Sequence, residues 1–239
     1  MNSNLCEIFF NKGDSLYRLY KYEDAILYFD RAIQLDQNYS DAFFKKGLSL
    51  AKLNRKQEAV MYFYKSLKSI SNNSNLYLNH AISLANKDNF ELSIKYLDKA
   101  IELAQKEKFL QALAFALKGH CLYKLKRFEE SLTCYNTAIY FDPNDASHFY
   151  KKGLTLALMN KHNEAINCFD MSIKLDKFNS DVFIQKGESL EALKRYNKAL
   201  LCYEKALKID SKNEYALAKK TSLCINQWLR PSKDNCIIV

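Results

Sequence analysis

Small and large apolar residues recur along this chain at a fixed interval. Three series of small residues share the steps 34, 34, 38, 34 and 34 in the numbering, and a large apolar residue stands four positions after each member of the second series. Apolar spacings of three and four between these positions predict helices rather than strands. The series are Gly13, Gly47, Ala81, Gly119, Gly153 and Gly187; Ala25, Ala59, Ser93, Ser131, Ala165 and Ala199; Ala32, Ser66, Ala100, Ala138, Ser172 and Ala206; and the large residues Phe29, Phe63, Leu97, Tyr135, Phe169 and Tyr203.

Each interval therefore predicts one pair of helices. Small residues at matched positions let two backbones approach, and the large residue fills the space beside them. Connecting segments such as YFDPNDAS and KLDKFNSD place Asp, Asn, Ser or Pro where one helix ends and the next begins, as helix caps require.

The helical unit of this period, with small residues at its eighth, twentieth and twenty-seventh positions, resembles the tetratricopeptide repeat (TPR). The resemblance implies an all-α fold, a right-handed α-solenoid of stacked antiparallel helix pairs. We predict an N-terminal extension (1–5), six TPR units (6–39, 40–73, 74–107, 112–145, 146–179 and 180–213), a capping helix (214–230) and a flexible tail (231–239). The third unit is the most divergent, and the insertion at 107–111 is expected to lengthen the adjoining helices.

The end of the stack should be covered by a helix that is polar on its outer side. Helical spacing predicts that Leu217, Thr221, Cys224 and Trp228 face the preceding repeat, and that Lys219 and Lys220 face water.

Composition supports a helical fold and a cytoplasmic setting. Hydrophobic residues make up 48% of the chain, which is ample for a core, and only two prolines and five glycines disfavour a turn-rich β fold. Seven cysteines without a CxxC pair favour a reducing compartment. We expect no secretory leader, and the sequence contains no apolar stretch long enough to span a membrane.

Candidate catalytic and metal-binding chemistry is sparse. Cys134, Cys168 and Cys202 are spaced 34 residues apart, so they could be interpreted as metal ligands. We favour a role in packing, because equivalent positions in stacked repeats lie about 10 Å apart, which is too far for the cysteines to share one metal ion. The four histidines show no ligand spacing, and no phosphate-binding or nucleophile motif occurs. We therefore expect no enzyme activity, no metal and no cofactor.

The TPR resemblance implies that the first helices of the repeats line a concave groove that binds a peptide. The alternative is that part of this apolar strip is core. The predicted groove residues are Phe10, Asp14, Tyr17, Phe44, Lys45, Leu48, Lys52, Leu78, Asn79, Ile82, His120, Tyr123, Lys124, Tyr150, Lys151, Leu154, Leu158, Ile184, Gln185 and Glu188. Changing Phe44 and Tyr150 to Ala is expected to abolish partner binding and leave the fold intact.

Charge helps to choose among partner classes. The protein carries a net charge of +9, yet the mapped groove has similar numbers of acidic and basic residues, so nucleic acid is disfavoured there. The surplus basic residues are assigned to a solvated outer face, as in the second repeat: Lys46, Arg55, Lys56, Lys65 and Lys68.

In one subgroup of TPR proteins, Lys, Arg and Asn side chains form a carboxylate clamp that holds the C-terminal tails of chaperones. The clamp positions here carry Phe10, Asp14, Lys45, Asn75 and Asn79, or Ala116, His120, Lys151, Asp181 and Gln185, and neither set matches. A chaperone tail is therefore disfavoured. We predict a non-catalytic interaction scaffold whose partner is a protein or peptide with an apolar or helical segment.

The last four residues, CIIV, resemble a prenylation box with Cys236 as the modified cysteine. This predicts an alternative function as a peripheral membrane or trafficking component tethered through Cys236. Against it, Val239 is not a favoured last residue, and a single lipid chain anchors weakly. The alternative interpretation is that the last four residues are an unmodified apolar tail.

Overall fold

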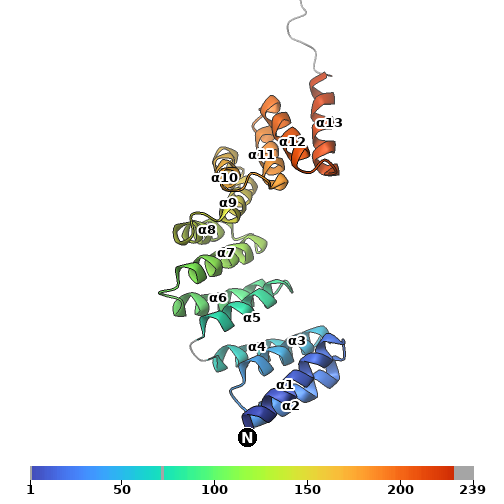
Figure 1. Cartoon of the computed structure of the whole chain (residues 1–239), viewed down its shortest axis with the longest axis vertical. Coiled ribbons are helices and arrows are strands. Elements are labelled where there is room, and N and C mark those ends of the chain that lie inside the picture. Colours follow the sequence, from blue (N-terminus) through green and yellow to red (C-terminus); the bar gives the residue numbers. More distant parts are fainter. Residues whose placement is uncertain (1, 71–72, 229–239) are drawn as a thin grey trace, which may run out of the picture. The chain divides into compact units, whose positions relative to one another are not determined.

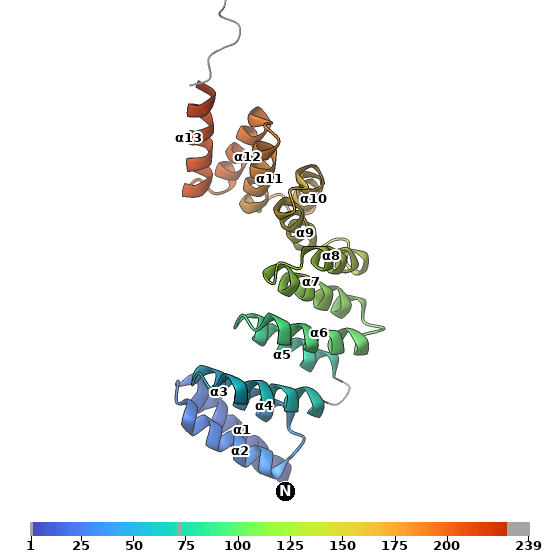
Figure 2. The same cartoon turned by 180° about the vertical axis from the view of Figure 1, so that it is seen from behind.

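The computed structural model describes residues 2–70 and 73–228, with the backbone alone for residues 2, 3 and 226–228. These residues form thirteen α-helices and no strand, which confirms the all-α prediction (Figures 1 and 2). The helices are α1 (Asn2–Arg18), α2 (Tyr22–Leu35), α3 (Ser40–Lys52), α4 (Lys56–Ser69), α5 (Ser74–Ala85), α6 (Phe90–Leu103), α7 (Lys108–Lys124), α8 (Phe128–Phe141), α9 (Ala146–Leu158), α10 (His162–Leu175), α11 (Ser180–Ala192), α12 (Tyr196–Ile209) and α13 (Glu214–Trp228).

The chain divides into two compact units, Met1–Gln105 and Lys106–Val239, called unit 1 and unit 2 below. Consecutive helices pack as pairs in both, from α1 on α2 to α11 on α12, and α13 packs on α12. The division falls within the one longer interval of the sequence repeat, between Ala81 and Gly119. The inserted residues extend α7, which is 17 residues long. Helix α1 begins at Asn2, so residues assigned to an N-terminal extension are helical, and the tail 231–239 lies outside the described residues.

Each helix pair is joined by the same tight turn. One residue in every turn has a positive φ between 58° and 62°, and none of these residues is glycine. The amide of the next residue donates to a carbonyl five positions earlier, as from Arg127 to Leu122 at 2.9 Å, which satisfies a carbonyl at the end of the first helix. The left-handed residues are Tyr20, Asn54, Asp88, Lys126, Asn160 and Lys194.

The small and large residues of the repeat form the interior, as predicted. All members of the second and third small-residue series, and all six large residues, are at most 2% exposed. Where serine replaces alanine, its hydroxyl can find a backbone acceptor: Ser93 donates to the Ala81 carbonyl and Ser131 to the Gly119 carbonyl, both at 2.8 Å. A buried hydroxyl there replaces alanine without being left unpaired.

The glycines of the first series lie against the large residue of the same repeat. A methyl group added at Gly153 would lie 2.5 Å from the Phe169 ring, and one at Gly187 would lie 2.5 Å from the Tyr203 ring. The third repeat differs at both positions, with Ala81 in place of the glycine and Leu97 in place of the aromatic residue. Because Leu97 is smaller than an aromatic ring, this repeat accommodates the extra methyl group.

One lysine assigned to the outer face is buried instead. Lys46 is 8% exposed, and its ammonium pairs with Asp30 of the preceding repeat at 2.5 Å and donates to the Tyr62 hydroxyl at 2.8 Å. Lys186 makes the equivalent ion pair with Asp170 of its own preceding repeat. The long lysine stem packs between helices and its charge reaches a carboxylate, so these lysines tie successive repeats together.

Helix α13 turns a different side to the stack from the one predicted. Ala216 and Leu223 are its buried residues and join the core around Tyr203, whereas Leu217 is 53% exposed and Thr221 and Cys224 are exposed. Lys219 and Lys220, which were expected to face water, are half-buried and pair with glutamates of α11 and α12. The assignment of the packing side was therefore wrong. The apolar spacing of Leu217, Thr221 and Cys224 is real but marks the exposed side, and the side chain of Trp228 lies outside the described residues.

Candidate functional site

The first helices of unit 1 present an open side, called here the unit-1 face. It consists of the outward residues of α1, α3 and α5 and of the turn after α5. Phe10, Tyr17 and Ile82 are half-buried on it, and Lys52 and Asn79 are exposed. All five are among the residues that the sequence analysis predicted to line the groove.

Three other predicted groove residues of unit 1 belong to the core. Phe44, Leu48 and Leu78 are only 2–4% exposed. The Phe44 ring stacks on the His80 ring with 3.8 Å between centroids, and also contacts Phe63. Truncating Phe44 would therefore damage the fold, so the expected clean loss of binding in a Phe44→Ala variant is corrected here. The apolar period predicted the helices correctly, but it does not show which of their apolar side chains are exposed to solvent.

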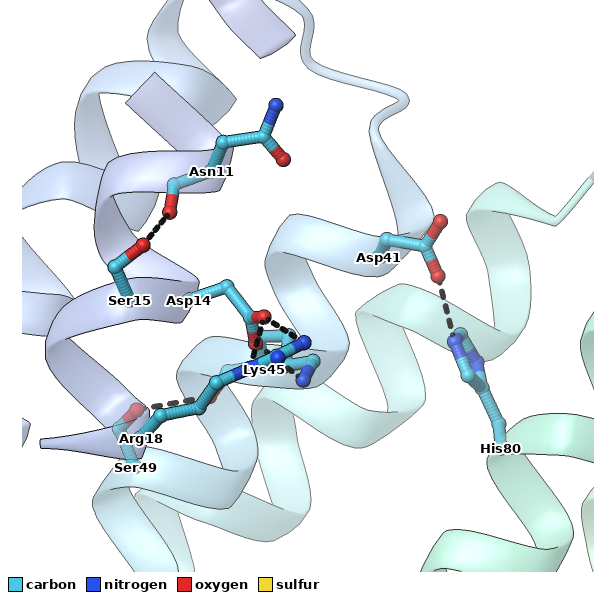
Figure 3. Close-up of polar contacts among 8 residues, drawn as sticks. All are labelled: Asn11, Asp14, Ser15, Arg18, Asp41, Lys45, Ser49 and His80. Atoms are coloured by element: carbon cyan, nitrogen blue, oxygen red, sulfur yellow. Dashed lines mark hydrogen bonds and ion pairs between the residues drawn. The ribbon is translucent and has the colours of Figure 1, made fainter. Parts of the chain in front are cut away.

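His80 holds the second and third repeats together behind this face. Its Nε2 donates to the Asp41 carboxylate at 2.8 Å (Figure 3). Its Nδ1 lies 3.4 Å from the Ser66 hydroxyl. Nearby, the Tyr96 hydroxyl donates to the Phe63 carbonyl at 2.6 Å. The histidine is 5% exposed, which makes it a structural residue of the junction rather than a ligand-binding group.

Asp14 links α1 to α3 on the unit-1 face. Its carboxylate accepts hydrogen bonds from Lys45 at 2.5 Å and from Arg18 at 2.9 Å (Figure 3). Burial alone would raise the pKa of Asp14, but the two cations outweigh burial and hold that pKa below its usual value. The Lys45 ammonium also lies 5.4 Å from the centre of the Tyr17 ring.

A third lysine, Lys87, joins Lys45 and Lys52 on this face. Burial lowers the pKa of Lys87, and repulsion from Lys52 and Lys45 lowers it further. Within the described part of the chain, Lys52 and Lys87 form no ion pair. Lys87 was missed in the sequence because it lies in the turn after α5, outside the helix positions used to map the groove.

The unit-2 face is the corresponding side of α7, α9 and α11. Burial lowers the pKa of His120, and repulsion from Lys151 and Lys124 adds to the effect. Tyr123 and Tyr150 are half-buried beside them. Burial raises the pKa of Tyr150 to about 12, aided by Asp181, so this phenol stays protonated and able to donate a hydrogen bond at neutral pH.

The remaining predicted residues of unit 2 divide between face and core. Leu154 and Gln185 are half-buried and Leu158 is exposed, but Ile184 is 4% exposed and belongs to the core. Glu188 is engaged by α13, since Lys219 pairs with it at 3.0 Å and the Tyr215 hydroxyl donates to it. The capping helix thus occupies one end of this face.

The repeated cysteines lie in the packing layer. Cys134, Cys168 and Cys202 are each at most 8% exposed, and burial raises the pKa of the Cys168 and Cys202 thiols. A thiol kept protonated is a poor nucleophile and metal ligand. Cys236 lies outside the described residues. Among the helices that the structure describes, none is long and apolar enough to cross a membrane.

Models of one repeat family match most of the sequence. Tetratricopeptide-repeat models match residues 10–75, 74–107, 148–179 and 180–213, and a TPR-repeat model matches residues 119–160. The chain belongs to the tetratricopeptide-repeat family. A search of curated proteins finds no significant match.

Solved TPR structures share the fold at low sequence identity. YrrB, described as a TPR protein with an unusual peptide-binding site, is 22% identical, covers 81% of this chain and 97% of its own, and superposes with a TM-score of 0.59. The Pseudomonas aeruginosa pilF protein is 12% identical, covers 94% of this TPR chain and 99% of its own, with a TM-score of 0.57. The APC/C assembly Cut9–Hcn1 contains a chain that is 14% identical, covering 91% of this chain and 42% of its own, with a TM-score of 0.58. At these identities the likeness concerns the fold.

Proposed function

We propose that this TPR chain is a non-catalytic interaction scaffold, and that its unit-1 face binds a segment of a partner protein that carries acidic side chains beside apolar ones. The proposal is carried by the electrostatic repulsion among three lysines of unit 1, since Lys52 and Lys45 both lower the pKa of Lys87, which burial lowers most. Asp14 is paired with Lys45, so Lys52 and Lys87 remain available to a ligand.

The charges favour an anionic ligand. Burial and two neighbouring ammonium groups disfavour the protonated form of Lys87. A carboxylate bound beside Lys87 would supply the missing opposite charge and raise its pKa again. The bound state would therefore relieve a repulsion that is present in the free protein, and part of the binding free energy would come from that relief.

The same face offers contacts for the apolar part of a ligand. Phe10, Tyr17 and Ile82 are half-buried around the lysines, and each leaves part of its side chain open. A peptide with alternating acidic and apolar residues, or an amphipathic helix, has both kinds of side chain on one surface. The sequence predicted a partner with an apolar or helical segment. Because of the lysine cluster, we propose that this segment also carries acidic side chains.

Selection from a random peptide library on the immobilised full-length chain tests this function. Peptides that contain both acidic and apolar residues should be enriched and should compete with one another. Selection of basic or purely apolar peptides would contradict the proposal. Displacement of the selected peptide by a single-stranded oligonucleotide at far lower concentration would also contradict it and point to a nucleic-acid ligand.

The lipid-anchored alternative remains a prediction from the sequence alone. It requires an isoprenoid on Cys236, which mass spectrometry of the C-terminal peptide from native protein would detect. An unmodified peptide would remove this alternative and leave the scaffold proposal unaffected.

A further inference from the structure

The turn between α8 and α9 gathers two carboxylates and one imidazole. Asp142 follows the end of α8, Asp145 precedes α9, and His148 lies in the first turn of α9. One ligand atom from each residue lies within 4.8 Å of the other two. Asp145 Oδ2 and His148 Nε2 lie 3.6 Å apart.

Both carboxylates use one oxygen to shape the turn. Asp142 Oδ1 accepts a hydrogen bond from the Asn144 amide at 3.1 Å, and Asp145 Oδ1 accepts one from the Ser147 amide at 2.8 Å. The Oδ2 atoms take no part in these bonds. The fold itself therefore orients the two carboxylates and leaves an oxygen of each for another partner.

His148 occupies a position that is apolar in the other repeats. The equivalent residues are Ile8, Ala42, Leu76, Ala114, Val182 and Ala216. His148 is only 3% exposed, and its Nδ1 is buried without a hydrogen-bond partner. Burying an imidazole costs free energy relative to the aliphatic residues used elsewhere. Of its two nitrogens, Nε2 faces Asp145, so Nε2 is the atom that an ion shared with the carboxylates would contact.

The contact between Asp145 and His148 is too long to compensate for that burial. At 3.6 Å it exceeds the range of a normal hydrogen bond. It suits a shared cation, because two ligand atoms each about 2.0–2.2 Å from a tetrahedral metal ion stand roughly 3.4 Å apart. Replacing a proton by a metal ion would turn a poor contact into two short bonds.

We propose that Asp142, Asp145 and His148 bind a divalent transition-metal ion of the Zn²⁺ type. A nitrogen ligand selects such ions over Ca²⁺ and Mg²⁺, which prefer sites made of oxygen atoms. Three protein ligands leave at least one position for water or a partner's side chain. The ion would join the end of the fourth repeat to the start of the fifth. This inference is independent of the peptide-binding proposal, since it concerns a turn of unit 2.

The turn after α10 in unit 2 provides a matched control. It has Asp176 and Asn179 in the two capping positions, and Asn179 accepts from the Asp181 amide at 3.1 Å. Val182 stands there in place of histidine and is fully buried. The variants Asp145→Asn and His148→Val therefore copy a turn that this fold already uses, and remove one ligand each.

Titration of the metal-free, untagged full-length chain with ZnCl₂ by calorimetry, and with CoCl₂ by visible absorption, tests the site. The expected result is one ion per chain, with a Co²⁺ spectrum that shows nitrogen ligation. Affinity should fall at least tenfold in Asp145→Asn and in His148→Val, and should stay unchanged in His162→Asn, a control histidine on α10. CaCl₂ and MgCl₂ should bind far more weakly.

Two results would overturn the inference. One is the absence of Zn²⁺ binding to the wild-type chain. The other is equal affinity in the wild type and both ligand variants, which would mean that an adventitious ion binds elsewhere. Circular dichroism checks folding, and if His148→Val unfolds, Asp145→Asn decides alone, because asparagine keeps the cap in the neighbouring turn.

Discussion

At the scale of single residues, the glycines and the left-handed turn residues decide how tightly each helix pair closes. The space beside Gly153 is set by the Phe169 ring, and the turn geometry is set by residues with a positive φ. Both are backbone requirements. Side-chain substitutions at these positions should therefore change stability without changing any surface contact.

Replacing Gly153 by Ala should destabilise the fold. The new methyl group would lie 2.5 Å from the Phe169 ring, so the ring or the helix must move. Overpacking of this kind costs about 1–3 kcal/mol, partly offset by the roughly 1 kcal/mol that alanine gains in a helix. Urea unfolding followed by circular dichroism measures the net loss. Gly119→Ala, where the nearest ring atom is 3.0 Å away, should lose less, and an equal or smaller loss at Gly153 would contradict this packing.

Replacing Lys126 by Gly should stabilise the chain. Lys126 has a positive φ of 62°. That conformation costs a non-glycine residue about 1 kcal/mol. Thermal melting should show a higher midpoint for Lys126→Gly than for the wild type. Asn160→Gly is the matched control and should gain less, because asparagine tolerates this conformation better. A lower midpoint for Lys126→Gly would show that the lysine side chain stabilises the turn.

At the scale of helices, the sequence predicted the elements better than their exposed sides. The three small-residue series and the large residues fix which helices pair, because a close backbone approach needs small residues in register. Phe44, Leu48, Leu78 and Ile184 show the limit: they have the period of a first-helix face yet lie in the core. The burial of Phe44, for example, depends on the His80 ring of the next repeat, a contact that no local sequence pattern contains.

Two substitutions in the capping helix α13 test which of its sides packs against the preceding helices. Leu223 is 4% exposed in the core around Tyr203, and Leu217 is 53% exposed on the solvent side of α13. Leu223→Ala should cost about 2–4 kcal/mol, because it leaves a cavity. Leu217→Ala should change stability by less than about 0.5 kcal/mol. The reverse ranking in chemical unfolding would restore the side predicted from the sequence.

At the scale of the whole molecule, the chain is two compact units with similar architecture and different surfaces. The unequal interval in the sequence marked the place where the units divide, although it was interpreted only as a longer helix. The lysine cluster of unit 1 was only partly predictable. Lys45 and Lys52 lie on mapped helix positions, whereas Lys87 reaches them from a turn, and such proximity arises from tertiary packing.

The central claim is that a partner peptide binds at the lysine cluster of the unit-1 face. It is tested by the dissociation constant of a selected acidic peptide, measured by fluorescence anisotropy for three forms of the chain. The variant Lys52→Glu with Lys87→Glu should bind at least tenfold more weakly. Lys56→Glu with Lys68→Glu makes the same change in net charge on exposed positions of α4 and should bind as the wild type does. If both double variants bound the peptide equally weakly, the loss of affinity would be due to net charge alone and not to the lysine cluster. Unchanged binding by the Lys52→Glu, Lys87→Glu variant would contradict the claim.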